Sequence, residues 1–222
     1  MKVLFISKDR EDPYIQSASA FVQKSFPDTS IILVKPGQSI TNEVLSWQGD
    51  LLLSYLCPWV LPDTLLTNAR YAAINFHPAT PDYPGTGCTN FAIYNGEKEY
   101  GVMCHHMVPS VDSGKVIAVR RFPVLENDSV YSLTQRCYAY MLELFYDIVS
   151  DILHNKPLPV SNERWTRKPY RRTELNALKK LELDMPLDEI KRRVRATTYP
   201  GTPSAYFEID GMRFEYVPED DK

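Results

Sequence analysis

Short apolar segments and helix-like segments alternate along the first 125 residues, and this alternation restricts the fold more than any other feature. We expect helices over residues 13–25, 62–68 and 88–94, on the basis of helical spacing of apolar residues or of a favoured helix stop. Between them lie apolar runs of strand length, at residues 3–7, 31–34, 50–55, 72–76, 101–108 and 116–124. Strands that alternate with helices in this way form an open sheet covered by helices. The sequence therefore predicts a three-layer α/β domain with a mixed, mainly parallel sheet.

A long amphipathic helix and a polar C-terminal appendage follow. From about residue 129 to residue 153 one helix face stays apolar, and the sequence NKPLP at 155–159 then breaks the pattern. The appendage is predicted to hold a helix over 174–183, a second helix that begins at Pro186, and a β-hairpin over 204–217. We therefore expect a main domain over residues 1–155 and a helical and β-hairpin appendage over residues 156–222.

Composition and charge exclude several classes of protein. With 44% hydrophobic and 24% charged residues the chain has the make-up of a globular protein with a core, and its longest apolar stretch, 50–62, is too short to span a membrane. The N-terminus has no cleavage pattern of a signal peptide, and the four cysteines form no CxxC pair. We expect a cytoplasmic protein with reduced thiols, no membrane association and no metal. A net charge of −3 argues against a nucleic-acid partner, although residues 163–195 are locally basic.

The residues that can carry chemistry gather between positions 74 and 117. No strand is followed by a glycine-rich dinucleotide or P-loop motif. Asn75 and His77 are two positions apart at the end of a predicted strand, so their side chains share one face. Asp112 follows the next strand, and its carboxylate can reach the imidazole if the two strands are neighbours. Ligands of open α/β sheets bind at the carboxyl ends of strands, so these three residues form the candidate catalytic group.

These motifs resemble the folate-dependent formyltransferase family: N-x-H, a Pro-rich loop, a short helix, a strand and then V-D-S-G. The resemblance implies a Rossmann-like formyltransferase fold and places Asn75, His77 and Asp112 at the catalytic positions. It also implies N10-formyltetrahydrofolate as the formyl donor. Six residues after the third strand resemble the wall that holds the pteridine ring, namely Tyr55, Leu56, Cys57, Pro58, Trp59 and Val60.

Three segments resemble the sugar N-formyltransferases within that family: FHPATPDYPGTGCTNFAIYN, SYLCPWVLP and RRTELNAL. This resemblance implies an amino-deoxysugar acceptor linked to a nucleotide, usually dTDP, and a role in lipopolysaccharide O-antigen or other surface polysaccharide synthesis. Candidate substrate-binding residues are turn, basic and aromatic side chains, namely Tyr83, Pro84, Gly85, Thr86, Arg171, Arg172, Tyr199, Tyr206 and Phe207. Exposed apolar positions in the hairpin and the late helices suggest a homodimer.

Other interpretations remain open at this point. The acceptor can instead be an aminoacyl-tRNA or a small phosphorylated amine, although only about 60 residues follow Pro159 and a further tRNA-binding domain is not expected. The chain can also be a non-catalytic module that binds folate or a nucleotide. His105 and His106 are adjacent on a strand and face opposite sides, so they cannot hold one metal ion together, but one of them can line the site.

Overall fold

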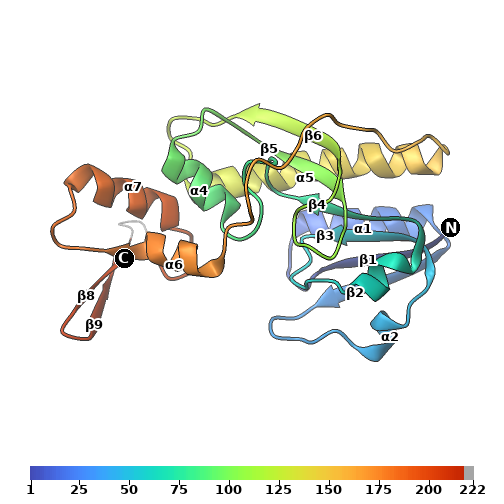
Figure 1. Ribbon diagram of the computed structural model, residues 1–222, viewed down its shortest axis with the longest axis horizontal. Helices are drawn as coiled ribbons and strands as arrows, with labels where there is room; N and C mark the ends of the chain where they lie inside the picture. Colours follow the sequence, from blue (N-terminus) through green and yellow to red (C-terminus); the bar gives the residue numbers. More distant parts are fainter. Residues whose placement is uncertain (218–222) are drawn as a thin grey trace.

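A six-stranded sheet forms the centre of the computed structural model, which describes residues 1–217 (Figure 1). In spatial order its strands are β2 (Asp28–Val34), β1 (Lys2–Lys8), β3 (Gly49–Tyr55), β4 (Ala69–His77), β5 (Glu99–His106) and β6 (Val116–Pro123). The first four strands run parallel, whereas β5 is antiparallel to both β4 and β6. The predicted mixed, mainly parallel sheet is confirmed. The order reverses at β1, which has β2 on one side and β3 on the other.

Helices cover both faces of this sheet and make the three layers. α1 (Pro13–Ser25) and α5 (Val130–Leu153) pack their apolar faces on one side, and the short α2 (Asn42–Leu45) and α3 (Asp63–Thr67) pack on the other. α5 has 24 residues, begins with a capping box at Ser129, and buries one face along its whole length. Within residues 1–217 no helix is both long enough and apolar enough to cross a membrane.

The C-terminal part lies at one end of the molecule and packs on α4 (Cys88–Asn95) (Figure 1). It contains α6 (Arg172–Lys179), β7 (Lys180–Leu181), α7 (Leu187–Thr197), β8 (Tyr206–Ile209) and β9 (Met212–Glu215). The predicted hairpin is confirmed as β8 and β9. The helix predicted over 174–183 is wrong in its extent, because the chain extends at Lys180 and pairs with β8, which buries Leu181.

The segment that connects α5 to α6 returns across the main domain. The Ser161 N–H donates to the Val116 carbonyl at 3.3 Å, and Tyr170 exchanges backbone hydrogen bonds of 2.9 Å with Pro84 and Thr86. Only glycine fits at position 85, because a Cβ atom there would lie 2.4 Å from the Tyr170 carbonyl oxygen. The first part of the expected appendage is therefore bound to the loop that follows β4. The division of the chain at residue 155 stays a prediction.

Candidate active site

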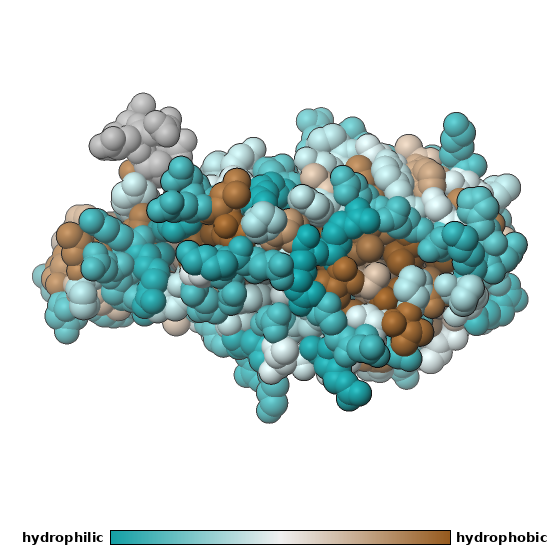
Figure 2. Space-filling view, turned by 90° about the horizontal axis from the view of Figure 1, so that it is seen from above, coloured by the Kyte–Doolittle hydropathy of each residue, from teal (hydrophilic) through white to brown (hydrophobic). Residues whose placement is uncertain are grey.

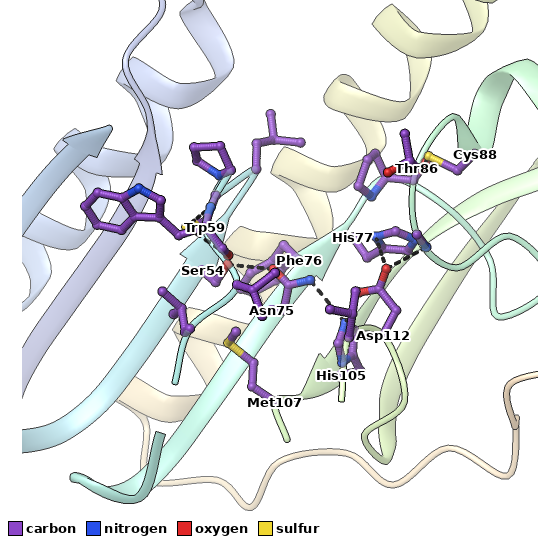
Figure 3. A pocket seen from close by; sticks show the side chains of 18 of the residues that line it. Ser54, Trp59, Asn75, Phe76, His77, Thr86, Cys88, His105, Met107 and Asp112 are labelled. Atoms are coloured by element: carbon purple, nitrogen blue, oxygen red, sulfur yellow. Dashed lines mark hydrogen bonds and ion pairs between the residues drawn. The ribbon is translucent and has the colours of Figure 1, made fainter. Parts of the chain in front are cut away.

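Asn75 and His77 lie at the carboxyl end of β4 and point to the same side of the sheet, as their spacing predicts (Figure 3). The Asn75 amide is held between two neighbouring strands. Its Oδ1 accepts a hydrogen bond of 2.7 Å from the Ser54 hydroxyl on β3, and its Nδ2 lies 3.1 Å from His105 Nε2 on β5. Residues from three adjacent strands therefore converge at one place.

The hydrogen bonds of His105 determine which way the Asn75 amide faces. His105 is 3% exposed, and its Nδ1 lies 2.8 Å from the His106 carbonyl oxygen. A carbonyl only accepts, so Nδ1 carries the hydrogen and Nε2 of the neutral ring presents a lone pair. That lone pair accepts one Asn75 Nδ2 hydrogen. The second Nδ2 hydrogen has no partner in the described residues, and Asn75 lines the cavity described below.

The two nitrogens of the His77 ring have different neighbours. Nε2 lies 3.1 Å from the Tyr83 carbonyl oxygen, so in the neutral ring it is the nitrogen that carries the hydrogen. Nδ1 lies 3.7 Å from Asp112 Oδ2, within ion-pair range but beyond hydrogen-bond length. This tautomer leaves a lone pair on Nδ1, next to a carboxylate that can stabilise a positive charge on the ring.

Asp112 reaches the site only because its loop folds back. β5 runs antiparallel to β4, so the loop of residues 107–115 must turn toward the carboxyl end of β4. Asp112 itself adopts a left-handed backbone conformation with φ of 43°. At Gly114 a Cβ atom would lie 1.8 Å from the His106 carbonyl oxygen, so the loop can close only with glycine there. Trp165 of the returning segment donates to the Gly114 carbonyl at 2.7 Å.

The Asp112 carboxylate is 10% exposed and lies between two imidazoles and a backbone N–H. Oδ2 accepts from the Gly85 N–H at 2.7 Å, and Oδ1 lies 3.5 Å from His105 Nε2. Burial alone raises the pKa of this carboxyl. A positive charge on His77 when that ring is protonated, the contacts with His105 and the Gly85 hydrogen bond outweigh burial and hold the Asp112 pKa well below its usual range. The group is therefore an anion at neutral pH.

The three residues line one cavity of about 570 Å³. Figure 3 shows Trp59 on one side of the Asn75, His77 and Asp112 group and Thr86 and Cys88 on the other. Apolar side chains and a thiol make up much of the lining, namely Leu56, Cys57, Pro58, Trp59, Val60, Leu61, Met107, Val108, Pro109 and Val111. The lining also includes Gly85 and the polar residues Lys8, Thr86, Tyr138 and Arg172. A group bound at the centre thus has Trp59 on one side and Thr86 and Cys88 on the other.

Two thiols line the cavity. Burial raises the pKa of Cys57 to about 11, and burial also raises the pKa of Cys88. Both groups are therefore protonated at neutral pH, whereas a cysteine nucleophile acts as the thiolate. Neither residue has the environment of a catalytic nucleophile. In residues 1–217 no group of three or more His, Cys, Asp or Glu side chains is arranged to hold a metal ion.

Several predicted site residues lie outside the cavity lining. Tyr55 is fully buried in the core, where its ring packs against Phe5 and Phe145. Tyr83 is 4% exposed and meets the site through its carbonyl oxygen rather than through its ring. The other residues that do not line the cavity are Pro84, Arg171, Tyr199, Tyr206 and Phe207. Tyr206 and Phe207 lie on β8, at the end of the molecule that carries the hairpin (Figure 1).

The site also contains residues that the sequence did not indicate. Ser54 and Lys8 occupy the carboxyl ends of β3 and β1, which is a signal that a search of all strand ends would have found. Trp165 packs edge-on against His105 and His77, with ring centroids 5.0 and 6.1 Å apart. The sequence indicates Trp165 only as an aromatic side chain that could stack on a base, and its contact with the two imidazoles could not be predicted because its segment is irregular in structure.

Asn75, His77 and Asp112 lie together at the edge of a mixed α/β sheet and line one cavity. This arrangement is typical of an active site that transfers a chemical group. Residues 30–148, more than half of the chain, match the family model described as Formyl transferase. The chain belongs to the formyl transferase family.

Similar proteins carry formyltransferase names. A methionyl-tRNA formyltransferase from Listeria innocua is 29% identical over 147 residues, which are 64% of this chain and 47% of the relative. The chain thus spans about half the length of such relatives. The structure of a sugar N-formyltransferase from Shewanella sp. FDAARGOS_354 matches this chain with a TM-score of 0.78 at 21% identity. The match covers 97% of this chain and 96% of the Shewanella chain. An N-formyltransferase from Helicobacter canadensis in complex with folinic acid and dTDP-3-aminofucose has a TM-score of 0.72 at 18% identity, over 95% and 85% of the two chains.

Proposed function

We propose that this protein transfers the formyl group of N10-formyltetrahydrofolate to the amino group of a nucleotide-linked amino-deoxysugar, with dTDP as the nucleotide. The observation that carries the proposal is the convergence of Asn75, His77 and Asp112 at the middle of one cavity. An amide donor, an imidazole and an anion are the groups that formyl transfer to an amine requires, since negative charge develops on an oxygen and a proton leaves the nitrogen.

Each residue has a definable task in this reaction. The Asn75 Nδ2 hydrogen that has no partner within residues 1–217 can bind the formyl oxygen as it becomes negative, an effect worth about 3 kcal/mol for one donor. His77 Nδ1 can accept the proton that the attacking amine loses, because Nε2 keeps its hydrogen on the Tyr83 carbonyl. The same proton would then pass to the folate nitrogen as its bond to the formyl carbon breaks. The Asp112 carboxylate, 3.7 Å away, then stabilises the imidazolium.

The cavity suits a folate donor on the Trp59 side. A flat pteridine ring can lie against the apolar wall of residues 56–61, where the Trp59 indole is fixed by a 2.6 Å hydrogen bond from Nε1 to the Gln38 carbonyl oxygen. When bound there, the donor supplies the formyl carbon that the amine attacks. The folinic acid in the Helicobacter canadensis N-formyltransferase complex supports a folate as the donor.

The acceptor then enters from the side of Thr86 and Cys88, and the cavity lining supplies the cations Lys8 and Arg172 and the hydroxyls of Thr86 and Tyr138. The dTDP-3-aminofucose in the same Helicobacter canadensis complex supports a dTDP-linked amino sugar. Surface polysaccharide synthesis remains a prediction from the sequence resemblance, and a cytoplasmic location remains a prediction from the N-terminal sequence.

The proposal includes a homodimer formed through the C-terminal hairpin. Met212, Phe214 and Val217 are 56%, 51% and 51% exposed, so the hairpin presents apolar side chains to solvent. Figure 2 shows apolar surface at the end of the molecule that carries the C-terminal part, in addition to a larger apolar hollow over the α/β part. Sedimentation of the wild type and of Phe214→Glu tests the dimer, and an unchanged monomer in both would contradict it.

Formyl transfer is tested with the wild-type protein, N10-formyltetrahydrofolate and a panel of nucleotide-linked amino sugars. Release of tetrahydrofolate and a gain of one formyl group in the sugar by mass spectrometry are the expected results. Asn75→Ala and His77→Ala should lower both signals by about 100-fold or more, with folding intact by circular dichroism. Donor binding without chemistry for any acceptor would instead identify a non-catalytic folate-binding module.

A second acceptor is favoured by the names of the similar sequences, which are methionyl-tRNA formyltransferases. The basic residues between 163 and 195 supply positive charge that an aminoacyl-tRNA would require. Formylation of methionyl-tRNA, with a KM that rises steeply with salt concentration, would support this acceptor over the sugar.

A further inference from the structure

Tyr83 lies in the loop between β4 and α4, and its backbone carbonyl is the hydrogen-bond acceptor of His77. The Tyr83 carbonyl oxygen lies 3.1 Å from His77 Nε2, whereas the Asp112 carboxylate lies 3.7 Å from Nδ1 of the same ring (Figure 3). The two acceptors compete for the one hydrogen that a neutral imidazole carries. The position of the Tyr83 carbonyl therefore helps to decide which nitrogen is free to accept a proton.

The charge of Asp112 favours the tautomer that the proposed reaction cannot use. A carboxylate attracts a hydrogen on His77 Nδ1 and repels the lone pair that Nδ1 presents in the other tautomer. Nδ1 can accept the amine proton only when it presents that lone pair. Of the two acceptors, only the Tyr83 carbonyl lies at hydrogen-bond length. The useful tautomer thus depends on the Tyr83 carbonyl staying where it is.

The Tyr83 side chain connects this carbonyl to the C-terminal end of α4. The Tyr83 hydroxyl donates to Glu97 Oε1 at 2.5 Å and accepts from Asn95 Nδ2 at 3.0 Å. Asn95 is the last residue of α4, and Glu97 follows the glycine that ends the helix. Burial, and then the hydrogen bond to Glu97, raise the pKa of Tyr83, so the hydroxyl keeps its hydrogen and remains the donor. A hydrogen bond to a carboxylate is stronger than one between neutral groups.

The hydroxyl bonds restrict a movement that the packing of the Tyr83 ring does not. The ring is 4% exposed, stacks on Tyr170 with centroids 6.1 Å apart and meets Tyr100 edge-on at 5.6 Å. Dispersion contacts of this kind are weakly directional, whereas two hydrogen bonds at the hydroxyl fix the ring along its long axis. Because the ring and the carbonyl belong to one residue, a fixed ring restricts the carbonyl as well.

We propose that Tyr83 is a positioning residue for His77: the hydrogen bond from its hydroxyl to Glu97 holds its carbonyl on His77 Nε2 and so keeps Nδ1 free as the proton acceptor. Tyr83 does not need to touch the formyl group or the amine, and it acts through the imidazole. The inference rests on the proposed function, since it deepens the account of the base in that reaction.

The test locates the hydrogen on His77 without chemistry, by heteronuclear NMR of the imidazole nitrogens in the full chain. The His77 signals are those missing from His77→Ala, and a nitrogen with a hydrogen differs in shift from one with a lone pair. Neutral His77 of the wild type should carry its hydrogen on Nε2. Tyr83→Phe should change the tautomer ratio toward Nδ1–H by about 2- to 10-fold, the range for weakening one neutral hydrogen bond. The kcat of formyl transfer should fall with the remaining Nε2–H fraction, with little change in either KM.

Tyr94→Phe is the matched control. The Tyr94 hydroxyl donates to Glu189 Oε1 at 2.9 Å, so this variant also loses a bond from a tyrosine to a carboxylate at the same end of α4, although His77 is not among the hydrogen-bond partners of Tyr94. It should keep the wild-type tautomer ratio and kcat.

Variants of Glu97 test the same bond from its other side, at a half-buried position that tolerates substitution. Glu97→Leu removes the acceptor and should reproduce Tyr83→Phe, whereas Glu97→Gln keeps an oxygen acceptor and should retain most of the Nε2–H tautomer. In the Glu97→Leu background, Tyr83→Phe should change nothing further. Glu97→Leu also decides the question if Tyr83→Phe fails to fold.

The outcomes separate this inference from the proposed function. A wild-type His77 with its hydrogen on Nδ1, or an unchanged tautomer ratio in Tyr83→Phe and Glu97→Leu, overturns the inference even if formyl transfer is observed. An equal loss of kcat in Tyr94→Phe also overturns it, because the effect would then come from α4 alone. If the ratio changes as expected but the wild type formylates no amine, Tyr83 still sets the His77 tautomer and the proposed function fails.

Discussion

Replacing His105 tests whether the orientation of the Asn75 amide matters for catalysis. His105 does not need to touch the formyl group in the proposed reaction. It accepts an Asn75 hydrogen at Nε2 because its Nδ1 hydrogen is directed to the His106 carbonyl. His105→Leu removes that acceptor, whereas the carbonyl of His105→Gln can replace it. The Ser54 hydroxyl cannot substitute, because a hydroxyl donates and accepts and therefore holds the amide in either orientation.

The size of the effect follows from these contacts. With His105 present, a flipped Asn75 amide would lose one hydrogen bond and place its oxygen against a lone pair, a preference of about 1–2 kcal/mol for the productive orientation. His105→Leu should remove this preference, so that the two orientations of the amide become about equally populated and kcat falls by about twofold. Asn75→Ala removes the donor itself and should lower kcat by about 100- to 1000-fold.

The assay is tetrahydrofolate release at saturating donor and acceptor, together with a double-mutant cycle. His105→Leu should lower kcat with little change in either KM, and His105→Gln should restore most of the rate. In the Asn75→Ala background, His105→Leu should cost nothing further, since the amide it orients is gone. Multiplicative losses in the double variant, or a His105→Gln protein as slow as His105→Leu, would refute the reasoning. Thermal melting shows whether loss of the contact with Trp165 has unfolded the protein.

Three further predictions concern the loop, the carboxylate and the cation. Gly114→Ala should destabilise the protein by about 1–3 kcal/mol in urea unfolding and lower kcat, because its Cβ atom would collide with the His106 carbonyl and displace Asp112. Asp112→Asn should lower kcat by about 100- to 10,000-fold at pH 7. The depressed Asp112 pKa means that the stability its charge contributes is present above about pH 4 and lost as the pH falls through the folded value, so Asp112→Asn should reduce acid destabilisation in pH-dependent melts. Lys8 lines the cavity, and burial and the charge of Arg10 lower its pKa to about 8, so the KM of an anionic acceptor should rise as the pH rises through about 8. This rise should be absent in Lys8→Arg.

Local patterns in the sequence were sufficient to predict the sheet and half of the site. Each strand of the main domain is an apolar run, and strand alternation alone places Asn75 and His77 on one face. The extent of α6 could not be predicted this way. Residues 180 and 181 fit a helical pattern, and only their pairing with β8, which comes 25 residues later in the chain, extends them.

The remainder of the site depends on contacts between distant segments. His105 faces Asn75 because β4 and β5 pair in one register, and no local spacing specifies that register. Tyr55 shows that a continuous segment of the sequence can include a residue that does not line the site. It lies in the same run as the cavity wall, but strand alternation turns it to the other face, into the core with Phe145. The wall begins only at Leu56, where the strand has ended.

The position of the Asp112 charge shows how the returning segment completes the site. The loop of Asp112 is held at Gly114 by the Trp165 indole, and its carboxylate is held by the Gly85 N–H. Gly85 is in turn bridged to Tyr170, whose backbone bonds the residues on either side of it. Residues 161–170 thus contact both groups that position the carboxylate: Trp165 binds Gly114, and Tyr170 pairs with Gly85. These residues lie beyond the boundary expected at residue 155. Because an unsupported carboxylate in so buried a place would be costly, formation of the triad is coupled to docking of this segment on the main domain.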